Sequence, residues 1–166
     1  FLVIFLFLLL LYWSTYRTQV PYYPSGRKVW AAVDAALPPG RPLRVIDIGS
    51  GIGGLVLALQ RRRPESTVEG IELAPLPWLA SHLRALATRS RARFIRGDYD
   101  KLDLGQYDAV FAYLSPAAMG ALWRKAAREM RPGSTLFSYE FIIEDRPPSR
   151  IVHPVAGGPA LYMWDF

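Results

Sequence analysis

Cysteine is absent from this sequence, and histidine occurs only twice, at His82 and His153. Without cysteine the chain can form no disulfide, no thiolate nucleophile and no cysteine-ligated zinc site. Two isolated histidines do not suggest a His-rich metal site either. We therefore expect that the protein uses no metal ion.

Lysine and acidic residues are scarce relative to arginine. The chain has 17 Arg and 3 Lys against 14 Asp and Glu, so its formal net charge is +6. Arginines gather at 61–63 and again between positions 84 and 96. They suit solvated helix ends, and they could also attract anionic lipid or an acidic partner. No helix-turn-helix, zinc-finger or RNA-binding signature accompanies the charge, so we expect no nucleic-acid partner.

Charged and polar residues are also missing from the first eleven positions, which read FLVIFLFLLLL. As a helix, residues 1–13 would be roughly 20 Å long, against about 30 Å of bilayer hydrocarbon. Because the chain starts with Phe and not Met, we expect a longer parent segment. A signal peptide is the alternative, but YWSTYRT offers no small-residue cleavage site and no basic n-region precedes the apolar run.

The residues after this run favour a membrane anchor. Tyr12 and Trp13 suit the aromatic belt of a bilayer interface, and Arg17, Arg27 and Lys28 follow them. We expect a single-pass anchor helix over 1–16, a linker over 17–28 and one folded domain over 29–166. The positive flank predicts that this domain lies on the cytoplasmic side of the membrane.

In the rest of the chain, expected strands alternate with expected helices. Ser25 resembles an N-cap, and the helix after it should stop before Pro38. Strands are expected at 43–49, 67–73, 92–98, 107–114 and 134–143, helices at 53–63, 76–89 and 116–130, and a terminal hairpin from 150–155 and 160–166. This order predicts an α/β, doubly wound, Rossmann-like sheet, mostly parallel with a C-terminal antiparallel hairpin. Ligands of such sheets bind at the carboxyl ends of the strands.

Leucine spacing identifies one of these helices as amphipathic. Leu76, Leu79, Leu83 and Leu86 recur at intervals of three and four residues. They therefore line one face of the helix expected at 76–89.

The stretch VIDIGSGIGG, residues 45–54, fits two cofactor-binding motifs. Gly49, Gly51 and Gly54 match the G-x-G-x-x-G dinucleotide fingerprint. Asp47, Gly49, Gly51 and Gly53 match D-x-G-x-G-x-G, the nucleoside-binding loop of methyltransferases that use S-adenosylmethionine (SAM). Glycines let the backbone approach either ligand closely, so they do not separate the two.

Three acids help to choose between the cofactors. Asp47 would oppose a pyrophosphate, whereas SAM carries a sulfonium and an ammonium that a carboxylate stabilises. Glu72, at the end of the second strand, suits the ribose diol of both cofactors. Asp98 could accept a hydrogen bond from an adenine amino group, with Tyr99 against the ring, although an Asp in a turn or helix cap is common. A dehydrogenase would also need a second domain, for which no residues remain.

These motifs, in this order, resemble those of class I SAM-dependent methyltransferases. The resemblance implies that Asp47, Gly49 and Gly51 hold the methionine part of SAM, Glu72 the ribose and Asp98 the adenine. The residues next to them, Ser50, Gly53, Leu73 and Tyr99, complete the expected cofactor contacts.

A narrower resemblance comes from VPYYPS before a helix, then DIGSGIGG, then GIEL. It is similar to small protein-lysine methyltransferases whose membrane-anchored members modify the adenine nucleotide carrier and the ATP synthase c-subunit. That family usually has an acid and an arginine where this chain has Ile52 and Gly54. The resemblance implies N-methylation of a lysine on a membrane-associated protein; a small-molecule acceptor, an NAD-binding module and a non-enzymatic module are the alternatives.

No residue is an obvious catalyst, because SAM is already activated and the protein mainly aligns the acceptor. An amine acceptor must be neutral, and a nearby acid or tyrosine could assist that. The candidates are Tyr22 in the linker, and Tyr113 and Ser115 after the fourth strand.

Overall fold

The computed structural model describes residues 25–166. The expected anchor helix, most of the linker and Tyr22 lie outside the described residues. Among the helices that are described, none combines the length and the apolar character needed to cross a bilayer.

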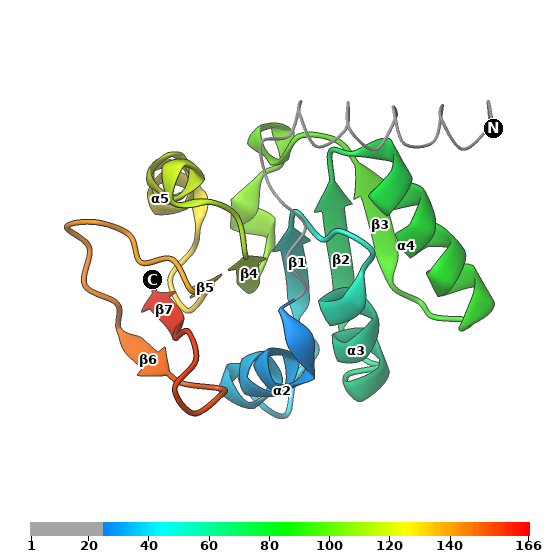
Figure 1. The fold of residues 1–166 in the computed structure, drawn as a ribbon, viewed down its shortest axis with the longest axis horizontal. Coiled ribbons are helices and arrows are strands. Elements are labelled where there is room, and N and C mark those ends of the chain that lie inside the picture. The colour runs from blue at the N-terminus through cyan, green and yellow to red at the C-terminus, as the bar shows by residue number, and fades with distance from the viewer. Residues whose placement is uncertain (1–24) are drawn as a thin grey trace.

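A seven-stranded sheet forms the centre of the molecule, in the order β3-β2-β1-β4-β5-β7-β6 (Figure 1). The strands are β1 (Arg44–Ile48), β2 (Thr67–Glu72), β3 (Arg93–Arg96), β4 (Ala109–Ala112), β5 (Thr135–Tyr139), β6 (Arg150–Val152) and β7 (Leu161–Asp165). The first five pair in parallel, while β7 runs antiparallel to both β5 and β6. The predicted Rossmann-like sheet with an antiparallel hairpin is therefore confirmed.

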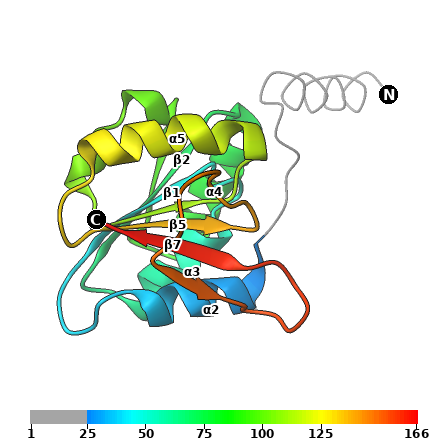
Figure 2. The same ribbon diagram turned by 90° about the vertical axis from the view of Figure 1, so that its left-hand side faces the viewer.

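Helices cover both faces of this sheet. They are α2 (Gly26–Ala36), α3 (Gly54–Arg62), α4 (Pro75–Ala87) and α5 (Pro116–Glu129), with two short 3-10 helices, η1 (Tyr99–Lys101) and η2 (Leu104–Gln106). Figure 2 shows α5 on one side of the sheet and α2 and α3 on the other. Two apolar clusters follow from this layering. Val33 and Leu59 belong to the cluster under α2 and α3, and Met119 and Leu122 to the cluster under α5.

Ser25 takes the predicted N-cap position of α2, but its side chain does not cap the helix. Instead its hydroxyl accepts a hydrogen bond from Trp30 Nε1 at 2.9 Å. The helix ends at Ala36, with Leu37 extended before Pro38, as the sequence predicts.

The fifth strand is shorter than expected. β5 ends at Tyr139 rather than at Ile143, because Glu140 has a φ of +72° and turns the backbone away from the strand direction. The turn is fixed by its hydrogen bonds: Glu140 N donates to Ala160 O, and Ser138 Oγ donates to Phe141 O.

The leucine face of α4 exists, but it does not face the core. Leu79, Leu83 and Leu86 are exposed, and the buried residues of the helix are Ser81 and Ala85. The reason is close packing: a Cβ built on Gly53 would lie 3.1 Å from Ser81 Cβ, so only small side chains fit beneath the helix.

Candidate cofactor-binding site

The loop between β1 and α3 is a chain of left-handed turns fastened to the neighbouring strand. Gly49, Gly51 and Gly53 have φ values of +72°, +54° and +78°, which glycine adopts with little strain. The amides of Gly49 and Ser50 both donate to the carbonyl of Ile71 in β2, at 2.9 and 3.1 Å. The loop therefore has a defined shape at the carboxyl ends of β1 and β2, where ligands of such sheets bind.

At two of these glycines, close packing within the protein also leaves no room for a side chain. A Cβ on Gly53 would overlap the ring of Phe94 in β3, and one on Gly49 would lie 2.9 Å from Leu114 Cδ2. Both approaches are far closer than a normal carbon contact. Gly53 is thus required by the approach of α3 to β3, a reason that the motif alone does not reveal.

Ser50 is buried beneath this loop and points at β2. A Cβ on Gly70 would lie 2.6 Å from Ser50 Oγ, so the hydroxyl lies against the bare backbone of the strand. Within residues 25–166, this is the buried side-chain oxygen that lacks a hydrogen-bond partner. Its predicted contact with the cofactor stays a prediction.

Glu72, at the end of β2, joins the two loops at this edge. Its Oε2 accepts from Gly51 N at 2.9 Å, and its Oε1 accepts from Ala74 N at 2.8 Å. A carboxylate offers about four acceptor positions, so two further hydrogen bonds from a ribose diol fit its chemistry. Leu73, next in the chain, is exposed, and its contact with the cofactor stays a prediction.

Asp47 is the most buried acid at this edge, with 6% of its surface exposed. No hydrogen bond joins its side chain to another of the described residues. Burial raises the pKa of this carboxyl well above its usual value, and the charge of Glu72 raises it further. A cationic ligand would compensate this buried charge, so Asp47 and Glu72 together fit the sulfonium and ammonium of SAM.

Asp98 and Tyr99 follow β3 at the same edge. The Gly97 amide donates to the Glu72 carbonyl at 3.1 Å, which holds the end of β3 beside the end of β2. Asp98 Oδ1 accepts from Asp100 N at 3.0 Å and so caps η1. Tyr99 is half-buried, and burial, with the Asp100 and Asp98 charges, raises its pKa. Their roles toward an adenine stay predictions.

The departures from the lysine methyltransferase motif have distinct surroundings. Ile52 is exposed at the tip of the loop, and its carbonyl accepts a hydrogen bond from Arg84 Nη1 of α4. Gly54, the first residue of α3, lies against Trp30, whose ring would be 2.5 Å from a Cβ at that position. Trp30 of α2 thus fills the space into which a side chain at position 54 would project.

The two described candidates for catalysis lie beyond β4. Tyr113 donates a hydrogen bond to Glu140 Oε2, and its ring packs at 5.0 Å from Tyr139 and 6.1 Å from Phe141, measured between centroids. Ser115 occupies the N-cap position of α5, where its side chain makes no capping bond.

Glu140 was missed because its position reads as strand interior in the sequence. The one sign of it in the sequence is that an acid directly precedes the apolar residues FII. In the structure, Glu140 has a φ of +72° and its side chain is exposed to solvent. The turn brings its carboxylate to the end of β4, beside Tyr113.

The strand order, the glycine loop after β1 and the acids at the carboxyl ends of β1, β2 and β3 define a class I SAM-dependent methyltransferase. Comparison with known proteins supports this class and identifies a family within it. The sequence profile of the ANTKMT methyltransferase domain family matches residues 47–150, and the chain belongs to this family. It is a SAM-dependent methyltransferase, and SAM rather than NAD is its cofactor.

Two relatives and one solved structure illustrate the match. The chain is 28% identical to a Caenorhabditis elegans lysine N-methyltransferase of the ATP synthase c-subunit, over 86% of this chain and 77% of the relative. It is 32% identical to the mouse adenine nucleotide translocase lysine N-methyltransferase over 82% of this chain and 59% of the relative. A Salinibacter ruber RNA methyltransferase solved with S-adenosylhomocysteine has the same fold, with a TM-score of 0.79, 23% identity, and coverage of 86% and 93% of the two chains.

Proposed function

We propose that this enzyme N-methylates a lysine of a membrane-associated protein. Three of the relatives found are named for lysine methylation, and two of these names give the acceptor, the adenine nucleotide translocase or the ATP synthase c-subunit. Membrane proteins of this kind are the acceptors that the proposal favours. The structural observation that supports a lysine acceptor is the Tyr113–Glu140 pair at the carboxyl ends of β4 and β5.

The strand order supports this position for the acceptor. Glu72 ends β2 and Asp98 follows β3, both on one side of β1, and they would hold the nucleoside there. The methionine part then points toward β1 and its other neighbour, β4. SAM, when bound, supplies a methyl group on a sulfonium, so the acceptor must reach that group from the side of β4 and β5.

The groups at this end of β4 suit an amine on an aliphatic stem. The carboxylate of Glu140 attracts the lysine ammonium, and the rings of Tyr113 and Phe141 can pack against its methylenes and its cation. Glu140 and Tyr113 would therefore position the lysine nitrogen, which must lose its proton to water before it reacts.

The membrane location of the enzyme is part of the proposal. An uncharged apolar run at 1–11, followed by Tyr12, Trp13 and the cations Arg17, Arg27 and Lys28, supports a single-pass anchor with the catalytic domain on the cytoplasmic side. An anchored enzyme would meet acceptors that lie in or on the same bilayer.

The test is methyl transfer from labelled SAM to a membrane preparation by the full chain. We expect label in a protein band and methyl-lysine after acid hydrolysis. Label confined to the lipid extract would instead assign a small-molecule acceptor and contradict the proposal.

A matched pair of variants tests the position of the acceptor. Glu140→Gln should raise the KM for the protein acceptor about tenfold, the effect of losing roughly 1.4 kcal/mol of charge-assisted binding. Glu144→Gln removes another exposed acid four residues further on and should leave the KM unchanged. Equal effects of the two variants would remove Glu140 from the acceptor site.

A further inference from the structure

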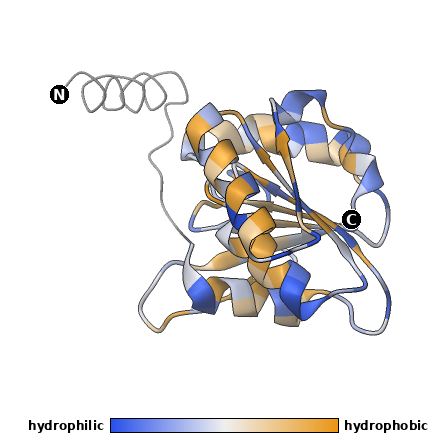
Figure 3. Ribbon diagram, turned by 90° about the vertical axis from the view of Figure 1, so that its right-hand side faces the viewer, coloured by the Kyte–Doolittle hydropathy of each residue, from blue (hydrophilic) through white to orange (hydrophobic). Residues whose placement is uncertain are grey.

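The outer surface of α4 exposes more apolar area than a solvated helix needs. Leu79, Leu83 and Leu86 are 44%, 55% and 65% exposed, and their spacing places them on one face of the helix. Figure 3 views the molecule from this side and shows hydrophobic bands along the helix. Exposed apolar side chains grouped on one face of a helix can mark a surface that contacts a partner protein, a membrane or a ligand.

The charge around this stripe has one sign. Residues 73–97, which include α4, β3 and the loop between them, contain five arginines and no Asp or Glu. Arg84 donates to the Ile52 carbonyl. The other four, at positions 89, 91, 93 and 96, are exposed, and none forms an ion pair with another of the described residues. The neighbouring helix α3 also lacks acids.

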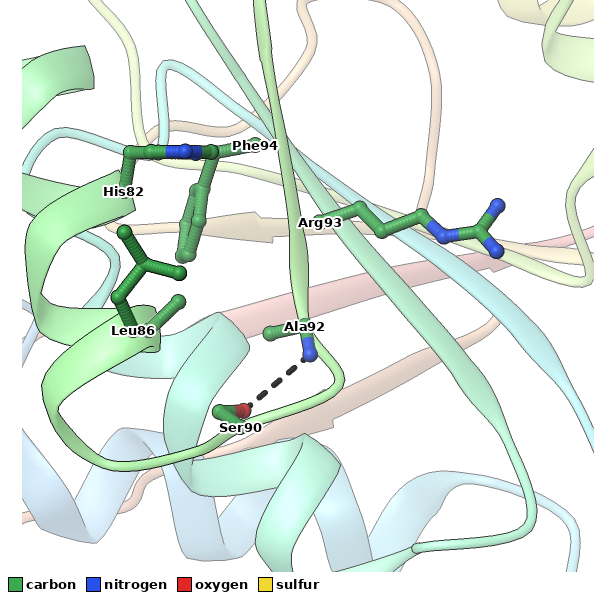
Figure 4. Close-up of a pocket in the computed structure, with 7 residues that line it drawn as sticks. His82, Leu86, Ser90, Ala92, Arg93 and Phe94 are labelled. Atoms are coloured by element: carbon green, nitrogen blue, oxygen red, sulfur yellow. Dashed lines mark hydrogen bonds between the residues drawn. The ribbon is translucent and has the colours of Figure 1, made fainter.

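A shallow hollow extends the apolar stripe toward β3. It has a volume of about 230 Å³ and lies between the C-terminal half of α4 and the edge strand. Figure 4 shows His82 and Leu86 projecting from α4 over the ring of Phe94, while Arg93 extends away from the hollow on the other side of β3. The hollow therefore continues the apolar surface of α4 as far as the edge strand.

We infer that this α4 surface, defined by Leu79, Leu83, Leu86 and the arginines at 89, 91 and 96, binds the interface of an anionic phospholipid bilayer. Leucines that enter the boundary of the acyl chains and cations that meet acidic headgroups are the two features of an interfacial helix. Three leucines are too few for the core of a stable protein interface, which buries about 1,600 Å² in total. The lipid surface is therefore the better fit.

The position of α4 gives this contact a consequence for the enzyme. The helix starts three residues after Glu72, at the carboxyl edge of the sheet. Docking α4 would hold the cofactor edge beside the membrane surface, where an acceptor lysine of a membrane protein would lie. The contact extends the proposed membrane location, but it requires neither SAM nor an acceptor.

The absence of cysteine allows a direct test with the full chain. Leu83→Cys, labelled with an environment-sensitive fluorophore, reports on the α4 surface. Ala127→Cys on α5, exposed on the opposite face of the sheet, is the matched control. In vesicles of phosphatidylcholine with 30% phosphatidylserine, we expect a blue-shifted emission and protection from iodide quenching at position 83 and neither at position 127.

Charge reversal tests the arginines. Arg89→Glu and Arg91→Glu, made together in the Leu83→Cys protein, should abolish the blue shift that anionic vesicles cause at position 83. Neutralising either arginine alone should weaken docking about fivefold, since each cation near an anionic surface contributes on the order of a fivefold change in affinity.

Several outcomes would overturn the inference. One is that positions 83 and 127 respond equally to anionic vesicles. Another is a shift at position 83 that depends on protein concentration without lipid, which would assign the surface to a second copy of the chain. A shift produced only by an acidic protein from the membrane would assign it to that protein. Failure of methyl transfer would not affect any of these readouts, so the two proposals can fail separately.

Discussion

The carboxylate of Asp47 is buried at a place where the described residues offer it neither a hydrogen-bond donor nor a cation. Burial raises its pKa, and the nearby Glu72 raises it further. A folded-state pKa above the unfolded value means that the native protein binds the proton more tightly. Stability is therefore lost as the pH rises from the usual Asp pKa to the raised one, and at neutral pH the cofactor-free protein is the less stable for it.

Asp47→Asn should separate stability from cofactor binding. We expect the variant to melt at a higher temperature than the wild type without SAM, because no buried charge remains. SAM should bind about tenfold to a hundredfold more weakly, the loss expected when an interaction with a charged group is removed. Calorimetric titration and thermal melting measure both quantities.

The pH dependence supplies the control for this substitution. Wild-type SAM affinity should rise with pH as Asp47 ionises, whereas the affinity of the Asn variant should stay flat over the same range. A variant that melts below the wild type without ligand would contradict the assignment of a destabilising charge.

Gly53 and Gly133 allow a matched test of the packing at the loop. Both have positive φ, +78° and +85°, but a Cβ would strike Phe94 at position 53 and meets nothing within 4 Å at position 133. Gly133→Ala should cost about 1 kcal/mol of unfolding free energy for the backbone conformation alone. Gly53→Ala should cost about 2–4 kcal/mol, because overpacking is added. Urea denaturation compares them, and equal costs would mean that Phe94 moves aside freely.

At the scale of single residues, the sequence could predict where the loop glycines, Asp47, Glu72 and Asp98 lie in the fold, because motif spacing places them at the carboxyl ends of strands. It could not predict why Gly53 is needed, since Phe94 lies 41 positions further along the chain. Glu140 was hidden for a related reason. Its exposure depends on a left-handed turn held by Ala160, which no local pattern announces.

Between elements, the contact of α2 with α3 explains one departure from the family motif. Gly54 stands where the lysine methyltransferases usually have arginine, and the Trp30 ring fills the space beside it. The tryptophan is held in place by its hydrogen bond to Ser25. The two positions should therefore be energetically coupled.

A double-mutant cycle tests this coupling. Gly54→Arg should destabilise the protein by about 1–3 kcal/mol, because the new side chain collides with the indole. In a Trp30→Ala background the same change should cost less, with a coupling energy of about 0.5–3 kcal/mol. If the losses of unfolding free energy from the two single substitutions simply add in the double variant, then an arginine at position 54 does not need the space that Trp30 occupies.

Element types were predictable where periodicity and Gly or Pro boundaries agreed, as in α5 between Pro116 and Pro132. The orientation of α4 was not, because leucine spacing defines an apolar face without saying what lies against it. Ser81 and Ala85 face the sheet because α4 approaches the loop at Gly53 closely. Tertiary packing, and not the leucine spacing, therefore decides which face of α4 lies against the sheet.

Binding of S-adenosylhomocysteine, the product that SAM leaves after methyl transfer, should stabilise the whole folded domain against unfolding. At S-adenosylhomocysteine concentrations 100-fold above the Kd, binding to the native state adds about 2.7 kcal/mol to the unfolding free energy. For a chain of this size that corresponds to a rise of about 5–10 °C in Tm. Differential scanning fluorimetry measures this rise, and NAD at the same concentration should produce none. A larger rise with NAD would reverse the cofactor assignment.

The sheet order β5-β7-β6 has a consequence for how the polypeptide is made. β6 leaves the ribosome before β7, yet β7 is the strand that joins it to β5. During synthesis β6 consequently has no partner in the growing sheet, and the exposed side chains of Ile151 and Val152 stay available to other chains. The nascent enzyme is therefore most vulnerable to misassociation in the interval between translation of residues 150–152 and 161–165.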